Sequence, residues 1–259
     1  MKLLNNSAKS VWAAVKTPMR SSAIDLKKYD SDKIHNRYLD WYDPLFEPLV
    51  WKQINLLEIG VHKGGSLLLW RDYFPCAKVV GIDLEVPPGL LQAEEHIHVF
   101  KGNQGNTRFL SQVAENTAPD GFDIIIDDGS HIADLTRISF WYLFENHLKP
   151  GGIYAIEDWG TGYWDDWPDG RTYRPQSQIR SLICDVLKRF GMISRIPSAT
   201  HRFGMVGFVK ELIDEQGAAD LTRATFTGRP GRSSRFENMT ITPSIVFVRK
   251  VGPDAASDI

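Results

Sequence analysis

The fold of this 259-residue chain is decided by Leu56-Leu57-Glu58-Ile59-Gly60-Val61-His62-Lys63-Gly64-Gly65-Ser66. Its apolar first half, Leu56–Val61, predicts a buried strand, and the glycine-rich second half predicts a tight turn. Apolar residues from Leu67 to Phe74 then follow helical spacing, and Lys78–Leu84 is a second β-branched run. Strand, turn, helix and strand in this order form a βαβ unit, which predicts two parallel strands with a right-handed crossover.

The alternation continues, which favours a mostly parallel sheet with helices on both faces. Further strands are expected at Ile97–Lys101, Phe122–Asp127 and Ile153–Ile156. Between the last two, apolar residues from Leu135 to Leu148 predict a helix, which Lys149-Pro150-Gly151-Gly152 should end.

The chain closes with two strand-like runs, Phe236–Ile241 and Ile245–Arg249. Strands so close in sequence form a hairpin, which places an antiparallel strand in the sheet. Before them we expect a helix from Pro175 to Phe190, a second helix over Met205–Glu215 and a mobile, Arg-rich loop over Arg223–Arg235.

These elements predict one domain rather than two. Residues 1–50 form an N-terminal helical segment, residues 51–250 form the α/β domain with a cap insertion at about 160–235, and residues 251–259 form a flexible tail.

The composition excludes several classes of protein. With 42% hydrophobic and 24% charged residues, the chain is neither disordered nor collagen-like. Thirty basic against 32 acidic residues give a net charge of −2, so no basic field favours nucleic acid. Two cysteines are too few for a secreted disulfide framework, and no apolar run is long enough for a signal peptide or a membrane span. We therefore expect a cytoplasmic protein.

The first turn predicts a nucleoside cofactor site. Ligands of open α/β sheets bind beyond the carboxyl ends of the strands, where Gly60 and Gly64 allow close approach to a helix N-terminus. Asp83 ends the second strand, where a carboxylate can accept hydrogen bonds from both hydroxyls of a ribose. The motif is E-x-G-x-x-x-G-G-S, whereas a dinucleotide site prefers G-x-G-x-x-G. The alternative is that these glycines only permit tight packing.

Acids end two strands that should be neighbours. The fourth strand ends in Asp127-Asp128-Gly129-Ser130-His131, and the fifth ends in Glu157-Asp158. Four carboxylates at one edge repel one another, so a positive group should lie between them, and oxygen ligands suit Mg²⁺. The alternative is that some of these acids cap helices, and the choice between Asp127 and Asp128 as ligand stays open. Glu157 and Asp158 can bind together only if the strand has ended by then, because neighbours on a strand point to opposite faces.

His131 follows the acids directly, and its imidazole could take a proton from a hydroxyl that the metal polarises. The alternative is a histidine that only binds the start of its helix. The aromatic residues Trp159, Tyr163, Trp164 and Trp167 could stack on a sugar, or could simply pack.

The Leu57–Val61 run, the Asp127–His131 segment and the Ile156–Asp158 segment resemble the metal-dependent sugar O-methyltransferases of macrolide biosynthesis, and rhamnosyl and other glycoside methyltransferases of actinobacteria are similar. An upstream patch, Ser31-Asp32-Lys33 with His35, Tyr38 and Tyr42, is similar to the N-terminal lid segment of that family.

The resemblance implies a class I methyltransferase fold, which is a mostly parallel, seven-stranded, Rossmann-like sheet with an antiparallel C-terminal strand. It implies that His131 is the general base and that Asp128, Glu157 and Asp158 bind Mg²⁺. We further expect Tyr38, Tyr163 and Trp164 to contact the substrate. The resemblance implies that S-adenosylmethionine is held by Glu58, Gly60, Lys63, Gly64, Ser66, Asp83, Gln104 and Asp127. Asn103 departs from the family pattern, and so does the long stretch Arg171–Phe203, which leaves the substrate unassigned.

We therefore expect an enzyme that methylates a sugar hydroxyl of a glycoside or oligosaccharide. The sugar is a natural-product deoxysugar, or mannose or rhamnose of an actinobacterial glycolipid or polysaccharide precursor. Neither nucleic acid nor a membrane span is expected, and the sequence leaves a homo-oligomer open. The alternatives are a catechol-type O-methyltransferase, a nicotinamide-dependent oxidoreductase on the same layered fold, and a non-catalytic binding module.

Overall fold

The computed structural model describes residues 20–90, 92, 94–172, 186–187, 189–190, 201–224 and 228–253. Most of the helix expected from Pro175 to Phe190, most of the expected tail and part of the Arg-rich loop lie outside the described residues. None of the helices within these ranges is both long and apolar enough to span a bilayer.

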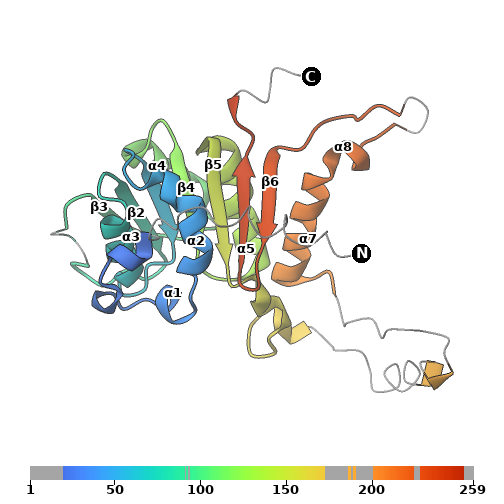
Figure 1. Cartoon of the computed structure of the whole chain (residues 1–259), viewed down its shortest axis with the longest axis horizontal. Coiled ribbons are helices and arrows are strands. Elements are labelled where there is room, and N and C mark those ends of the chain that lie inside the picture. Colours follow the sequence, from blue (N-terminus) through green and yellow to red (C-terminus); the bar gives the residue numbers. More distant parts are fainter. Residues whose placement is uncertain are drawn as a thin grey trace, which may run out of the picture.

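The core of the protein is a single mixed sheet (Figure 1). Within the described residues it has seven strands in the order β3-β2-β1-β4-β5-β7-β6. The strands are β1 (Asn55–Ile59), β2 (Lys78–Asp83), β3 (Ile97–Lys101), β4 (Phe122–Asp127), β5 (Leu148–Glu157), β6 (Phe236–Ile241) and β7 (Ile245–Lys250). Strands β1 to β5 pair in parallel, and β7 is antiparallel to both β5 and β6. The predicted parallel sheet with an antiparallel C-terminal strand is confirmed.

Helices cover both faces of this sheet. In Figure 1, α2 lies in front of the sheet, α1 lies below it and α7 runs beside β6. The helices are α1 (Asp32–His35), α2 (Leu39–Phe46), α3 (Gly65–Tyr73), α4 (Thr107–Thr117), α5 (Ala133–Asn146), α7 (Gly204–Gln216) and α8 (Ala218–Leu221). Short 3₁₀ turns lie at Arg20–Ala23, Leu26–Lys28, Glu47–Leu49, Trp159–Tyr163 and Gly170–Thr172.

The two faces of the sheet bury separate hydrophobic cores. Leu57 packs with residues of α4, α5 and α7, whereas Leu56 packs with residues of α2 and α3. Because side chains alternate along a strand, Glu58 lies on the α2–α3 face. The same alternation places Glu157 on that face, and it places Asp127 on the other face with Ile125. The alternation of side chains along the strands therefore places Glu58 and Glu157 on one face of the sheet and Asp127 on the other.

Two elements differ from the sequence expectation. Strand β5 begins at Leu148, because Leu148 pairs with Phe122 before the register shifts and Ile153 pairs with Ile124. The expected helix-ending turn Lys149–Gly152 is therefore an irregular part of the strand, with Gly151 at φ 76°. Helix α4 was not expected, although Asn106 caps it by accepting a hydrogen bond from the Phe109 N–H and its buried residues follow helical spacing.

A buried carboxylate fastens α7 to the loop before β6. Glu215 has a side chain only 4% exposed and contacts both Arg232 (2.6 Å) and Arg235 (3.0 Å). Burial by itself would raise the pKa of Glu215, but hydrogen bonds from the two arginines outweigh burial and lower the pKa from 4.5 to about 2. The end of the expected mobile loop is therefore tied to the helix.

This contact predicts that wild type and Glu215→Gln differ in stability by an amount that depends on pH. Because the folded-state pKa of Glu215 is depressed, its contribution is complete above the ordinary pKa of 4.5 and is lost as the pH falls towards about 2. We expect Glu215→Gln to lower the free energy of unfolding at pH 7 by about 2 kcal/mol. Urea unfolding of both proteins between pH 7 and pH 3.5 should show this difference shrinking below about pH 5. A difference that grew on acidification would contradict the assignment.

Candidate active site

A hollow of about 1130 Å³ lies beyond the carboxyl ends of β1 and β2. Of the residues predicted to hold a cofactor, it is lined by Gly60, Lys63, Ser66, Asp83 and Gln104. Glu58, Gly64 and Asp127 do not line it. Strand β1 lies between β2 and β4, so the hollow occupies the point where the strand order reverses.

The turn after β1 packs directly against the turn after β4. Gly60 has φ 93°, and a Cβ atom there would lie 2.0 Å from the backbone oxygen of Asp128. The N–H of Asp128 in turn donates to the carbonyl of Ile59 at 2.8 Å. Gly64, at φ 82°, then begins α3 in the left-handed conformation. Glycine is required at position 60 both by the backbone angle and by the close approach.

Asp83 organises the same turn from the end of β2. Its Oδ2 accepts hydrogen bonds from the N–H groups of Val61 (2.8 Å) and His62 (3.0 Å), and its Oδ1 accepts one from Glu85. Burial would raise the pKa of Asp83, but the backbone donors outweigh burial and lower it. The carboxylate is therefore ionised at the wall of the cavity, and because two backbone donors already occupy Oδ2, a ligand hydroxyl would bind at Oδ1.

Asp127 and Asp128 face different surroundings. The Asp127 carboxylate is buried on the α4–α5 face, where it accepts hydrogen bonds from Ser139 (2.8 Å) and Gln104 (3.3 Å). Burial raises the pKa of Asp127. Gln104 also accepts a hydrogen bond from the Ser130 N–H at 3.0 Å, so it joins the cavity wall to the end of β4. Asp128, rather than Asp127, lies with the other candidate metal ligands.

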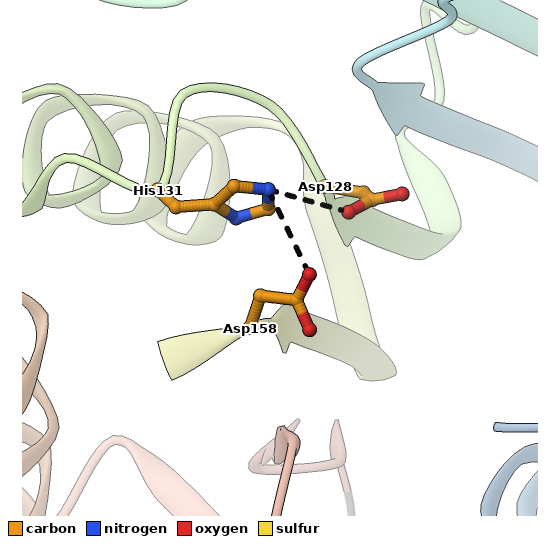
Figure 2. Close-up of side chains that lie close together, drawn as sticks. All are labelled: Asp128, His131 and Asp158. Carbon is orange, nitrogen blue, oxygen red and sulfur yellow. Dashed lines mark ion pairs between the residues drawn. The ribbon is translucent and has the colours of Figure 1, made fainter. Parts of the chain in front are cut away.

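Asp128, His131 and Asp158 converge at the edge of β4 and β5, as Figure 2 shows. One potential ligand atom from each lies within 4.8 Å of the others. His131 Nε2 lies 3.7 Å from Asp128 Oδ1 and 4.0 Å from Asp158 Oδ2. Their side chains are 13 to 20% exposed, so a ligand can reach them.

Left-handed backbone brings two of these three side chains together. Asp158 has φ 52° and follows directly after β5 ends at Glu157, and His131 has φ 49°. Such conformations are unfavourable for residues other than glycine and often mark functional sites. The end of the strand therefore separates Glu157, which lies beneath α2, from Asp158, which faces His131.

The positive group expected between the acids is present within the chain itself. The amine of Lys33 lies 2.6 Å from Asp128 Oδ2, 3.0 Å from Glu157 Oε2 and 3.2 Å from Glu58 Oε1. Burial would lower the pKa of this amine, but the three carboxylates outweigh burial and raise the pKa well above 10.5. Sequence reasoning missed this role because Lys33 lies 95 residues from Asp128 along the chain.

Two tyrosines from the same N-terminal segment bind one oxygen each of Glu157 and Asp158. The hydroxyl of Tyr42 donates to Glu157 Oε1, and the hydroxyl of Tyr38 donates to Asp158 Oδ1. Burial and the nearby Asp128 raise the pKa of Glu157. Tyr38, which was expected to contact a substrate, thus lies against an acid and is only 4% exposed.

The aromatic residues after β5 have different surroundings. Trp167 donates to the carbonyl of His131 at 3.2 Å, and Trp159 donates to the carbonyl of Thr242 at 3.0 Å. Trp164 is 51% exposed, and the ring of Tyr163 lies 5.0 Å from that of His201. Trp159 and Trp167 therefore contribute to structure, whereas Trp164 offers an open aromatic face.

The donor set fits a hard divalent cation. Mg²⁺ is usually bound through one or two carboxylates and keeps several water molecules. Asp128 and Asp158 provide two carboxylates on an accessible edge, and one potential ligand atom of each lies within 4.8 Å of the other and of His131. Both oxygens of Glu157 already carry donors, from Lys33 and Tyr42, so its role as a third ligand stays a prediction.

No model of a known protein family matches the chain. The chain is 38% identical over 225 residues to mycinamicin VI 2''-O-methyltransferase of Micromonospora griseorubida, which covers 74% of this chain and 55% of that protein. It is 36% identical over 162 residues to 8-demethyl-8-(2-methoxy-alpha-L-rhamnosyl)-tetracenomycin-C 3'-O-methyltransferase of Streptomyces olivaceus, which covers 56% of this chain and 40% of that protein. The chain thus spans about half the length of these curated relatives, or less.

Solved structures show the same relationship. The MycE methyltransferase of mycinamycin biosynthesis, in complex with Mg and SAH, matches with a TM-score of 0.61 and 30% identity, over 83% of this chain and 48% of that one. A second MycE structure, with Mg, SAH and mycinamycin VI, matches with a TM-score of 0.59 and 28% identity, over 86% of this chain and 51% of that one. The expected class I methyltransferase fold is confirmed, and so is the resemblance to sugar O-methyltransferases.

The contact between the turns after β1 and β4 predicts that one added methyl group at Gly60 strongly lowers stability. We expect Gly60→Ala to lower the free energy of unfolding by about 3 kcal/mol or more, because its Cβ overlaps the Asp128 carbonyl. Gly89→Ala is the matched control, since Gly89 also has a positive φ but has nothing within 4 Å of an added Cβ; it should cost about 1 kcal/mol. Urea unfolding measures both values, and equal losses would contradict the close approach.

Proposed function

Since the homologues of this chain are sugar O-methyltransferases and its fold is that of class I methyltransferases, we propose that it transfers a methyl group from S-adenosylmethionine to a sugar hydroxyl of a glycoside. One observation supports this most strongly. The cavity beyond β1 and β2 continues to Asp128, so a cofactor and the Asp128–His131–Asp158 cluster share one site.

In this proposal the cavity holds S-adenosylmethionine. Asp83 accepts hydrogen bonds from the ribose hydroxyls, and the N-terminus of α3 receives the carboxylate of the methionine part. Gly60, Lys63, Ser66 and Gln104 complete the contacts. Glu58, Gly64 and Asp127 do not line the cavity. Glu58 supports its wall by accepting a hydrogen bond from Ser66 at 2.7 Å, and Asp127 does so by accepting one from Gln104.

Asp128 and Asp158 hold Mg²⁺, and the resemblance adds Glu157 as a third ligand. When bound, the ion lowers the pKa of a coordinated hydroxyl and fixes its direction. MycE, which was crystallised with Mg and SAH, supports this assignment because it matches 83% of this chain with a TM-score of 0.61 and 30% identity. The chain's own contribution is to place two carboxylates at an accessible edge.

His131 takes the proton from the sugar hydroxyl during attack on the methyl group. Its Nε2 faces Asp128 and Asp158, so it lies beside any hydroxyl held at the cluster (Figure 2). Trp167 and Thr161 both donate to the backbone carbonyl of His131, at 3.2 and 3.4 Å, which holds the backbone that carries the ring. Alignment of hydroxyl and methyl donor converts an encounter in solution into a reaction within one complex.

The acceptor is a small glycoside or an oligosaccharide. Tyr163 and Trp164 follow β5 a few residues after Asp158 and can stack on the apolar face of a sugar, and Tyr38 binds Asp158 itself. One relative acts on mycinamicin VI and another on a rhamnosyl tetracenomycin, which favours a deoxysugar of a glycosylated natural product.

Turnover tests the proposal directly. We expect transfer of labelled methyl from S-adenosylmethionine to at least one member of a glycoside panel in the presence of Mg²⁺, and loss of transfer in EDTA. The panel should include a catechol, and calorimetry with NADH should accompany it. Turnover of the catechol alone would favour the catechol type, and binding of NADH without S-adenosylmethionine would favour the oxidoreductase.

Replacement of the base should separate chemistry from binding. We expect His131→Ala to lower kcat by about 10²- to 10⁴-fold while the affinity for S-adenosylhomocysteine stays unchanged. His98→Ala, at an exposed position in β3, is the control and should leave kcat unchanged. An equal kcat in His131→Ala and wild type would remove His131 from the mechanism.

Replacement of a cluster acid should weaken cation binding. We expect Asp158→Asn to lower the affinity for Mn²⁺, measured by electron paramagnetic resonance as a probe for Mg²⁺, by about tenfold or more. Asp134→Asn removes the same charge from an exposed acid at the start of α5 and should leave the affinity unchanged. Unchanged binding in Asp158→Asn would place the cation elsewhere.

A further inference from the structure

One buried amine contacts acids from three different strands. Lys33, whose side chain is fully buried, binds Glu58 in β1, Asp128 after β4 and Glu157 at the end of β5. Glu58 lies in β1 just before the turn that borders the cofactor cavity, and its Oε2 accepts a hydrogen bond from Ser66, which lines that cavity. The amine therefore joins the cofactor side of the site to the side of the acid cluster.

The residues just before Lys33 are part of the cavity wall. Asp30, Ser31 and Asp32 line the cavity. The backbone of Asp30 lies directly on the start of α3, because a Cβ at Gly65 would come within 1.9 Å of the Asp30 oxygen. We call residues 30–42 the strap. The strap covers the cavity with its first residues and reaches the acids with Lys33, Tyr38 and Tyr42.

A substitution at Glu157 can test this link between the acids and the cavity without altering a residue that lines the cavity. Its carboxylate is buried, does not line the cavity, and binds two residues of the strap, Lys33 and Tyr42. A change at Glu157 can therefore reach the cavity wall through the strap. Tyr42 lies at the far end of the strap, whereas Lys33 is next to the wall residue Asp32.

We propose that Lys33 is a positioning residue that couples the cofactor cavity to the acids at the ends of β4 and β5. This proposal rests on the proposed function, because the ligand of the cavity is taken to be S-adenosylmethionine. The amine holds the strap against the cavity only while its carboxylate partners are in place, since an unpaired charge is costly in a buried position. The acids thereby affect cofactor affinity without touching the cofactor.

The test measures binding of S-adenosylhomocysteine by calorimetry in EDTA, so that no metal contributes. We expect Lys33→Met to weaken binding by about tenfold or more, and Glu157→Gln to weaken it by about fivefold. The double variant should bind no more weakly than Lys33→Met alone, because residues acting through one contact are not additive. Arg37→Met is the matched control: it removes one positive charge from an exposed side chain of the strap and should bind like wild type.

Hydrogen exchange of the strap amides supplies a readout without any ligand. Residues 31–38 should exchange faster in Glu157→Gln than in wild type, while the amides of β1 and β4 keep their protection. This comparison also serves if Lys33→Met does not fold.

The two hypotheses fail in different ways. Wild-type protein that binds no S-adenosylhomocysteine would overturn the proposed function. Wild-type binding together with unchanged affinity and unchanged strap exchange in Glu157→Gln would overturn the coupling alone. Additive losses in the double variant would also overturn it, because Lys33 and Glu157 would then act independently.

Discussion

Charge balance at the carboxyl ends of β1, β4 and β5 is the constraint on which the site depends. Four carboxylates meet there, and two of them, Glu58 and Glu157, are fully buried. Like charges so close together and so poorly hydrated would protonate or move apart without a counter-charge. The amine of Lys33 supplies that counter-charge for three of them, and the hydroxyl of Tyr38 binds Asp158.

This arrangement divides the acids between two tasks. Glu58 and Glu157 point to the α2–α3 face and bind the N-terminal segment, whereas Asp128 and Asp158 keep oxygens directed at His131 and the accessible edge. The division follows from strand geometry and from the left-handed turn at Asp158, which redirects the chain after β5. A cluster able to bind a cation is thus built on a layer of acids that the protein has already neutralised.

The site also depends on turns that only particular residues allow. Gly60 lets the turn after β1 touch the turn after β4, so that the cofactor cavity and the acid cluster lie next to each other. His131 and Asp158 adopt positive φ angles that cost energy, and neighbouring contacts hold them there: Trp167 binds the carbonyl of His131, and Tyr38 binds the carboxylate of Asp158. Rigid elements therefore support a strained but accessible centre.

Local patterns in the sequence determined the sheet, its first turn and the positions of the acids. Apolar runs bounded by glycine or acid predict β1, β2, β3 and β4 to within two residues, because burial on both faces of a parallel strand leaves a continuous apolar signal. The start of β5 and the presence of α4 were not predicted. In the first case pairing with Phe122 outweighs local turn chemistry, and in the second the apolar spacing is short and follows polar loop residues.

Only the tertiary structure decided which acids share a neighbour. Asp127 and Asp128 are indistinguishable by sequence, but the strand period turns them to opposite faces of the sheet. The counter-charge was predicted as a requirement, and its source was not, because an ion pair between Lys33 and Asp128 joins segments 95 residues apart and leaves no periodic trace in the chain. Sequence patterns report local propensity and burial, whereas contacts between distant side chains exist only after the chain has folded.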